Sequence, residues 1–274
     1  MPVISNNAAA NSAVAYLNMN SAAESAAIQK IASGSRITQA SDDAAGLAIS
    51  TSISSDITTL QQAATNASQA TSILQTADGG AANISNILTR MKSLASESAS
   101  GTVTDSSRVY IQAEFSQLSS EIDSIASGTS YSGQNLLDGT SAFATGVNVL
   151  VGSSSADSVS VTIANLSVSS LGIGSLDVST ESGATSAMST LDTAINTVSA
   201  ARATIGAQES RFNFSANSIS TQTQNLQGAN SAITDVDVAQ EEATLSSAMV
   251  KTQAAVSAET AANQMPQYLL KLLG

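Results

Sequence analysis

The acidic pair Asp42 and Asp43 is the nearest that this sequence comes to a constellation of residues able to do chemistry. Neighbouring carboxylates can bind a cation or act as an acid–base pair. The same pair follows Ser41 and precedes an alanine-rich stretch, where a side-chain oxygen caps free N–H groups and negative charge meets the positive end of a helix dipole. Helix capping explains the pair more simply, so we predict neither a metal site nor a catalytic site here.

The amino-acid composition excludes most other kinds of catalytic or metal site. The chain of 274 residues contains no His and no Cys. This excludes the commonest general base, the commonest zinc ligand, thiolate nucleophiles and disulfides. A phosphate-binding glycine loop is also missing from the sequence. We therefore predict that the protein is not an enzyme and binds no cofactor or metal.

Charge and hydropathy limit the partners. With only nine Lys and Arg and a formal net charge of −12, the chain has no basic surface for nucleic acid or for anionic membranes. No stretch approaches the roughly 18 apolar residues of a membrane span. The first residues lack the basic and apolar regions of a cleaved secretory signal. These features alone favour a cytoplasmic protein, and they leave open export by a route without a cleaved signal.

The elements that organise the chain are long helices, because Ala and Ser dominate and aromatic residues make up only 3%. The strongest pattern is a large apolar residue at every seventh position of residues 188–233, which predicts one helix with a continuous apolar stripe. We assign this stripe to the intrachain core, with an intersubunit contact as the alternative. Its members are Leu191, Val198, Ile205, Phe212, Ile219, Leu226 and Ile233.

A second long helix is predicted over residues 44–99, with Ile53, Leu60, Leu74 and Leu88 on its core face. The pair of glycines at 79–80 interrupts it, but the stripe resumes in phase, so a continuous helix is favoured over two shorter ones. A third helix is expected over residues 104–128. Alternating valines around residues 147–151 and 159–163 then predict a β-hairpin within the region 140–186.

Residues 3–31 and 236–273 carry weaker apolar stripes and would bury little in a monomer, so we expect them to serve mainly in assembly. The last helix is expected to run from residue 236 to about residue 264, before Pro266. Arg36 is expected to pair with a carboxylate within or between subunits, or simply to face water. The other candidate assembly residues are Val14, Leu17, Ile28, Leu245, Met249, Val256, Met265, Leu269 and Leu272.

Four stretches, in order, resemble bacterial flagellins. IASGSRITQASDDAAGLAIS, residues 31–50, is similar to the N-terminal signature of that family, and AANQMPQYLLKLL, residues 261–273, to its C-terminal ending. Residues 93–139 resemble the segment that leads to the central region of flagellins. LDTAINTVSAARATIGAQESRF, residues 191–212, resembles the returning segment.

The resemblance implies a mainly α-helical protein, built as a long antiparallel coiled-coil bundle with a small β-hairpin region and with both termini helical and paired. Residues 1–40 and 236–274 would form the inner D0 domain, and residues 41–235 the D1 domain. In D1 the helix at 44–99 would supply the partner of the heptad helix.

The implied function is that of a structural subunit that is exported unfolded through the flagellar type III apparatus and self-assembles into a secreted, extracellular helical filament for motility. Its implied partners are copies of itself, the filament cap, the hook–filament junction proteins, the export apparatus and an export chaperone. A hook-associated junction protein, which shares the helical ends, is the alternative.

One further segment resembles the site that the animal innate receptor for flagellin recognises. Arg90, Leu94 and Glu114 match that site, whereas Ser93 stands where many recognised flagellins have Glu.

Overall fold

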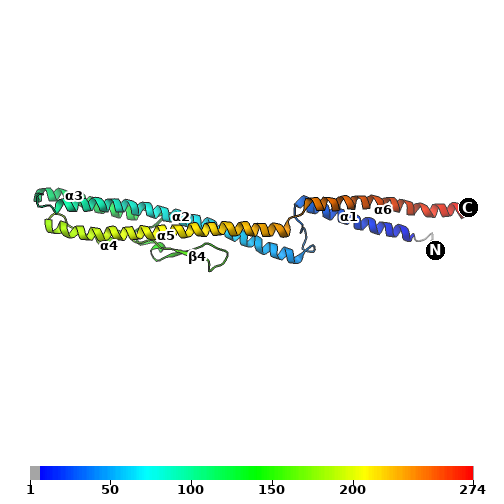
Figure 1. The fold of residues 1–274 in the computed structure, drawn as a ribbon, viewed down its shortest axis with the longest axis horizontal. Helices are drawn as coiled ribbons and strands as arrows, with labels where there is room; N and C mark the ends of the chain where they lie inside the picture. The colour runs from blue at the N-terminus through cyan, green and yellow to red at the C-terminus, as the bar shows by residue number, and fades with distance from the viewer. Residues whose placement is uncertain (1–6, 274) are drawn as a thin grey trace. The chain divides into compact units, whose positions relative to one another are not determined.

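The computed structural model describes the backbone of residues 7–273 and the side chains of residues 7–268. The chain is mainly helical, with small two-stranded sheets in its middle region (Figure 1). The α-helices are α1 (Ala8–Ser33), α2 (Ala44–Ser98), α3 (Asp105–Gly128), α4 (Val168–Leu171), α5 (Glu181–Thr234) and α6 (Val238–Leu273). The remaining elements are β1 (Ser130–Tyr131), β2 (Gln134–Asn135), the short 3₁₀ helix η1 (Ala142–Ala144), β3 (Val147–Leu150) and β4 (Ser158–Val161).

Contacts divide the chain into two compact units. The terminal unit contains residues 1–55 and 225–274, and the central unit contains residues 56–224. Because α2 and α5 are long, each contributes one end to the terminal unit and the rest of its length to the central unit.

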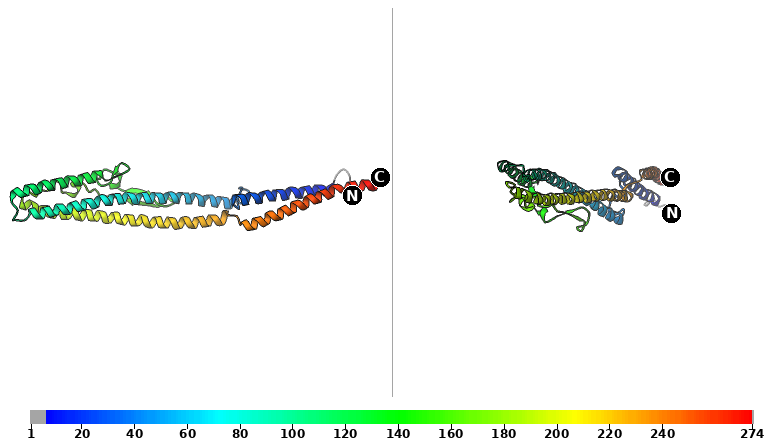
Figure 2. Two further views of the ribbon diagram at one scale, coloured as in Figure 1. Left: turned by 90° about the horizontal axis from the view of Figure 1, so that it is seen from above. Right: turned by 60° about the vertical axis from the view of Figure 1, so that its left-hand side comes forward.

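In the terminal unit α1 and α6 lie side by side and antiparallel, which confirms the expected pairing of the termini (Figures 1 and 2). At one end of this pair the side-chain amide of Asn7 donates to the carbonyl oxygen of Ala262 over 2.8 Å. At the other end Lys30 lies 3.9 Å from Glu241.

The segment that follows α1, residues 34–36, is hydrogen-bonded to the segment that precedes α6, residues 234–236. The α1 helix ends at Gly34, whose φ of 71° lies in the left-handed region that glycine adopts without strain. The backbone N–H of Arg36 donates to Thr234, that of Val236 donates to Gly34, and Ser35 forms an isolated bridge with Asp235. The ends of α1 and α5 and the start of α6 are thereby joined.

Asp43 caps α2, as predicted, whereas Asp42 binds the turn that precedes the helix. Asp43 accepts a hydrogen bond from the backbone N–H of Gly46 at the start of α2, over 2.8 Å. Asp42 accepts bonds from the backbone N–H groups of Thr38 and Gln39, and these bonds lower the pKa of its carboxyl group. Both carboxylates therefore organise the turn before α2.

In the central unit α2 and α5 pair antiparallel, and α3 packs beside them as the third helix. The buried side chains form one core that also takes in β4 and the loop before α5. Its largest fully buried members include Phe115, Phe212, Leu74, Leu88, Met91, Ile122, Leu137 and Ile163.

The α2 helix is continuous through Gly79 and Gly80, as predicted. Gly80 has a packing role, because a Cβ atom there would lie 2.5 Å from Oγ1 of Thr129 and 2.7 Å from Cδ1 of Leu137. The glycine thus lets the end of α3 and the following loop lie directly against α2.

The β3–β4 hairpin confirms the predicted alternation of valines, with Val147 opposite Val161. Its β4 strand buries Val159 and Val161. The amide of Gln208 on α5 binds both backbone groups of Thr162, accepting from the N–H over 3.1 Å and donating to the carbonyl over 2.9 Å. One side chain of α5 therefore completes the hydrogen bonds of the backbone that follows β4.

Two helices extend further than the sequence indicated. The α5 helix begins at Glu181 rather than 188, because the Thr180 hydroxyl caps it by accepting from the backbone N–H of Gly183. The α6 helix continues through Pro266, where we expected it to have ended. Proline has no N–H to donate to the carbonyl of Ala262, four residues earlier, and the side chain of Asn7 supplies that hydrogen bond instead.

Candidate assembly surface

Among the described residues of the α1–α6 pair the buried ones are all alanines, and Leu17 and Leu245 are half-buried in phase with them. Ala10, Ala13 and Ala27 of α1 are buried, together with the residues Ala248, Ala255 and Ala262, which recur at heptad spacing on α6. Small side chains allow the two helix backbones to approach closely. We call this set of buried residues the alanine seam.

Most of the large apolar side chains of the same helices are exposed. Most of the exposed large apolar residues of the described chain belong to α1 and α6, although these helices make up a minor part of its length. They are Val14, Tyr16, Met19 and Ile28 on α1, and Val238, Met249, Val250, Val256, Met265 and Tyr268 on α6. An exposed array of this kind marks a surface that another molecule covers.

The predicted assembly residues fall into three groups. Val14, Ile28, Met249, Val256 and Met265 are exposed, and Leu17 and Leu245 are half-buried in phase with the buried alanines. The side chains of Leu269 and Leu272 lie outside the described residues. The exposed Tyr16, Met19, Val238, Val250 and Tyr268 were not among the predicted assembly residues. The heptad spacing of the alanines at 248, 255 and 262 was the sequence signal that could have identified the buried face of α6, and hence the exposed residues.

Arg36 has a local partner. Its guanidinium Nη2 donates to the carbonyl of Ile233 over 2.8 Å, while its side chain remains exposed. It therefore binds one of the free carbonyl groups at the end of α5 rather than a carboxylate.

The predicted core stripes of α2 and α5 are buried along most of their length. Leu60, Leu74 and Leu88 of α2 and Leu191, Val198, Ile205, Phe212 and Ile219 of α5 are all buried. Ile53, Leu226 and Ile233, which belong to the terminal unit, are half-buried. The heptad stripe therefore faces a filled core only within the central unit.

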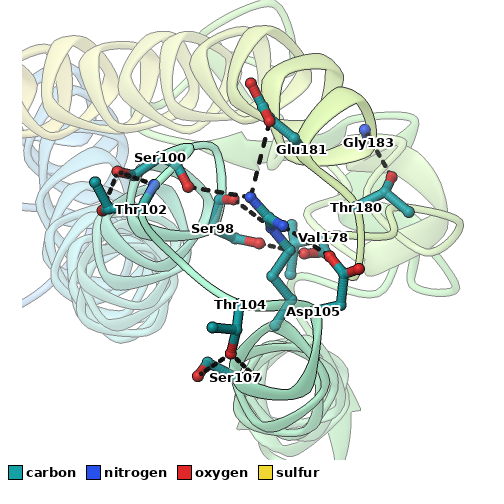
Figure 3. A network of polar contacts seen from close by, with 11 residues as sticks. Ser98, Ser100, Thr102, Thr104, Asp105, Ser107, Val178, Thr180, Glu181 and Gly183 are labelled. Carbon is teal, nitrogen blue, oxygen red and sulfur yellow. Dashed lines mark hydrogen bonds and ion pairs between the residues drawn. The ribbon is translucent and has the colours of Figure 1, made fainter.

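A buried arginine ties together the end of the central unit at which α3 and α5 begin (Figure 3). Arg108 is only 6% exposed and donates to the carbonyls of Ser98 and Ser100 at the end of α2. It also forms an ion pair with Asp105 over 2.8 Å, and its Nη2 lies 3.9 Å from Glu181. The Ser98 hydroxyl donates to the carbonyl of Val178 in the same network.

Ion pairs also bridge α2 and α5. Arg202 forms a bidentate pair with Asp78, which raises the pKa of the guanidinium through hydrogen bonding and charge, and Lys92 pairs with Asp192. Burial, and then the negative charge of Asp78, raise the pKa of Glu209. The carboxylate of Glu209 is therefore unfavourably placed, beside ion pairs that join α2 and α5.

The residues that resemble the innate-receptor site are divided between surface and core. Arg90 and Glu114 are exposed and form an ion pair over 2.6 Å between α2 and α3. Leu94 is 2% exposed and belongs to the core.

Nothing in the described part of the chain suggests a reactive centre. Its acidic side chains form no cluster of three or more that could hold a metal ion. Within the same limits, no helix combines the length and apolarity that crossing a bilayer requires. A hollow of about 400 Å³ between α1 and α6 is lined by small or polar residues such as Ala243, Thr244 and Ser247.

In the described part of the chain, long paired helices with exposed large apolar side chains are typical of a structural protein whose surface another molecule covers. The family models agree: that of the bacterial flagellin N-terminal helical region matches residues 4–142, and that of the C-terminal helical region matches residues 188–273. The chain belongs to the bacterial flagellin family. As a flagellin, it is a structural subunit of the extracellular flagellar filament, self-assembles and has no enzymatic role.

Relatives of known name match nearly the whole chain. A flagellin of Halalkalibacterium halodurans is 33% identical over 273 residues, covering 99% of each chain. The flagellin of Bacillus subtilis is 33% identical over 301 residues, covering 98% of this chain and 99% of that one. A 30.7 kDa flagellar filament core protein of Treponema maltophilum is 33% identical over 285 residues, covering 99% of each chain.

Two solved structures have similar folds. The crystal structure of Bacillus cereus flagellin gives a TM-score of 0.52 at 32% identity, covering 61% of this chain and 94% of that one. A putative flagellar hook-associated protein of Vibrio parahaemolyticus gives a TM-score of 0.59, covering 71% and 100%. Its identity of 13% shows a shared fold alone.

Proposed function

We propose that the α1–α6 pair is the part of this flagellin that holds the filament together, through the large apolar side chains on its outer surface. One observation carries this proposal: the pair uses alanines for its own interior and leaves larger apolar residues such as Met249 and Val256 exposed. In this proposal residues 1–40 and 236–274 form the inner D0 domain, and residues 41–235 form D1.

The energetics favour assembly of many copies over a free monomer. Full burial of a Val, Ile or Met side chain stabilises by about 1.5–3 kcal/mol. The alanine seam buries much less per residue, so the pair is expected to gain most of its stability from neighbouring subunits. Contacts repeated along a helical lattice make a weak pairwise interface strong collectively.

The same thin interior suits the export route that the proposal includes. A chain whose terminal helices bury mainly alanine is easily kept unfolded for passage through the type III apparatus. The partners proposed for that route are the export apparatus and an export chaperone. At the growing filament they are the cap and the hook–filament junction proteins.

Deleting residues 255–274 tests the assembly role of the C-terminal helix. We expect a secreted or purified chain that stays soluble and does not form filaments, as seen by negative-stain microscopy and sedimentation. Normal filaments from the shortened chain would refute the role assigned to this helix. Full-length chain that never forms micrometre-long fibres would instead favour the hook-associated alternative.

A pair of substitutions separates surface contacts from helix integrity. Met249→Ser with Val256→Ser removes exposed apolar area and leaves the seam unchanged. We expect monomer helicity by circular dichroism to be retained and polymerisation to be lost. The matched control, Ser246→Ala with Ser257→Ala, changes exposed positions of the same helix and should polymerise normally.

A further inference from the structure

The outer face of α5 carries an exposed aromatic residue and an exposed basic residue. Phe214 is 74% exposed, whereas Phe115, Phe143 and Phe212 are buried. Arg211, one turn before it, is exposed, and no ion pair or side-chain hydrogen bond of Arg211 is found within the described chain. Most other basic residues are already engaged, as the pairs of Arg90, Lys92, Arg108 and Arg202 show.

A complementary surface lies on α3. Val109 and Tyr110 are 61% and 78% exposed, on a helix whose basic side chain Arg108 is buried. Asp105, one turn before Val109, has a side chain that is 94% exposed even though its Oδ1 contacts Arg108. The start of α3 therefore presents an acidic group followed by an apolar pair, and α5 presents a basic group followed by an aromatic ring.

The order of these groups along α5 and α3 fits two copies of the chain arranged in parallel. Arg108, in the first turn of α3, reaches Glu181, the first residue of α5, so both helices start at the same end of the central unit (Figure 3). They also run in the same direction from that end (Figures 1 and 2). When two copies are aligned in parallel, a single displacement along the helices places Arg211 beside Asp105 of the second copy. The same displacement places Phe214 beside Val109 and Tyr110.

We propose that the Arg211–Phe214 face of α5 binds the Asp105–Tyr110 face of α3 in a second copy of this chain. The inference rests on the proposed function, because it takes the partner to be another subunit, and it adds a central-unit contact to that of the terminal helices. The two faces differ, so the contact is heterologous and each bound copy presents a free face to the next. Such a contact extends into an open polymer rather than closing as a dimer.

The positions of the two faces also set the stagger between the copies. At about 1.5 Å of rise per residue, Phe214 lies roughly 50 Å from the start of α5 and Tyr110 roughly 8 Å from the start of α3. Neighbouring copies in this contact are therefore displaced along the helices by on the order of 40 Å.

Cysteine cross-linking tests the contact directly, because the natural chain contains no Cys. The variant V109C with F214C is assembled together with wild-type chain and oxidised, and a gel under non-reducing conditions reports covalent dimers and longer ladders. We expect these species from filaments and not from monomers, since a disulfide needs Cα atoms within about 7 Å. The control S124C with F214C places the first thiol roughly 22 Å further along α3 and should give none.

A charge series tests the energetic role of the same face. We expect Arg211→Glu to fold as the wild type does by circular dichroism and to raise the critical concentration for polymerisation about tenfold or more, with Arg211→Lys close to wild type. Filaments that incorporate the cysteine variant without cross-links, or an Arg211→Glu chain that polymerises like the wild type, would overturn the inference and leave the proposed function intact. If the wild-type chain itself formed no filaments, the proposed function would fail first.

Discussion

The substitution Phe212→Ala measures how much of the central unit depends on the pairing of α2 with α5. Phe212 is fully buried on α5, two residues before the exposed Phe214. The same substitution at these neighbouring positions removes the same atoms from the same helix, with similar effects on helix propensity. Any difference between Phe212→Ala and Phe214→Ala therefore reports burial alone.

The expected loss has two components. Returning a buried aromatic side chain to water costs about 2–3 kcal/mol, and the cavity left among its neighbours adds on the order of 1–2 kcal/mol. Phe212→Ala should thus lower the free energy of unfolding by about 3–5 kcal/mol. For a unit of this size each kcal/mol corresponds to roughly 2–4 °C, so the melting temperature should fall by about 6–20 °C.

The assay is unfolding of the unpolymerised chain by heat and by urea, followed by far-ultraviolet circular dichroism. Phe214→Ala should change the free energy of unfolding of the monomer by no more than about 0.5 kcal/mol, and should weaken polymerisation instead. Equal stability losses for the two variants, or no loss for Phe212→Ala, would refute the assignment of the heptad stripe to the intrachain core.

Three further perturbations probe the polar contacts. Arg108→Met should destabilise the monomer by about 3–5 kcal/mol in urea unfolding, because it leaves buried carbonyls without a donor; a loss below 1 kcal/mol would contradict this. Gln208→Leu should cost about 1–3 kcal/mol and speed amide exchange at Thr162, whereas an unchanged exchange rate would argue against that hydrogen bond. Burial and Asp78 raise the pKa of Glu209, so its ionisation opposes folding as pH rises through that pKa. Glu209→Gln should therefore raise the melting temperature at pH 7 and not at pH 3, and an equal rise at both would contradict the electrostatic cause.

Sequence periodicity predicted the central unit well because large side chains identify a buried stripe without ambiguity. The heptad positions from Leu191 to Ile219 are buried, and the alternating valines of the hairpin pair as expected. The start of α5 was placed too late, because Thr180 and the polar residues after it are equally typical of a loop. Only the cap that Thr180 makes to Gly183 distinguishes the two cases.

Contacts distant in sequence account for the other differences. The passage of α6 through Pro266 depends on Asn7, which binds the carbonyl that the proline leaves free. The burial of Arg108 likewise depends on carbonyl groups at the end of a different helix. No periodic pattern reports such pairings, because each is a single polar contact between separate elements.

The terminal helices show that the largest apolar residues of a subunit need not face its own interior. In an isolated monomer the largest apolar residues are expected to turn inward, since burial of area drives folding. In α1 and α6 the fully buried positions belong to alanines, and residues such as Met249 and Val256 are exposed. This arrangement is costly for a monomer, and in the proposed function the larger apolar area is buried against neighbouring copies. We therefore expect the stability of the α1–α6 pair to depend on assembly, and the deletion and serine variants measure that dependence.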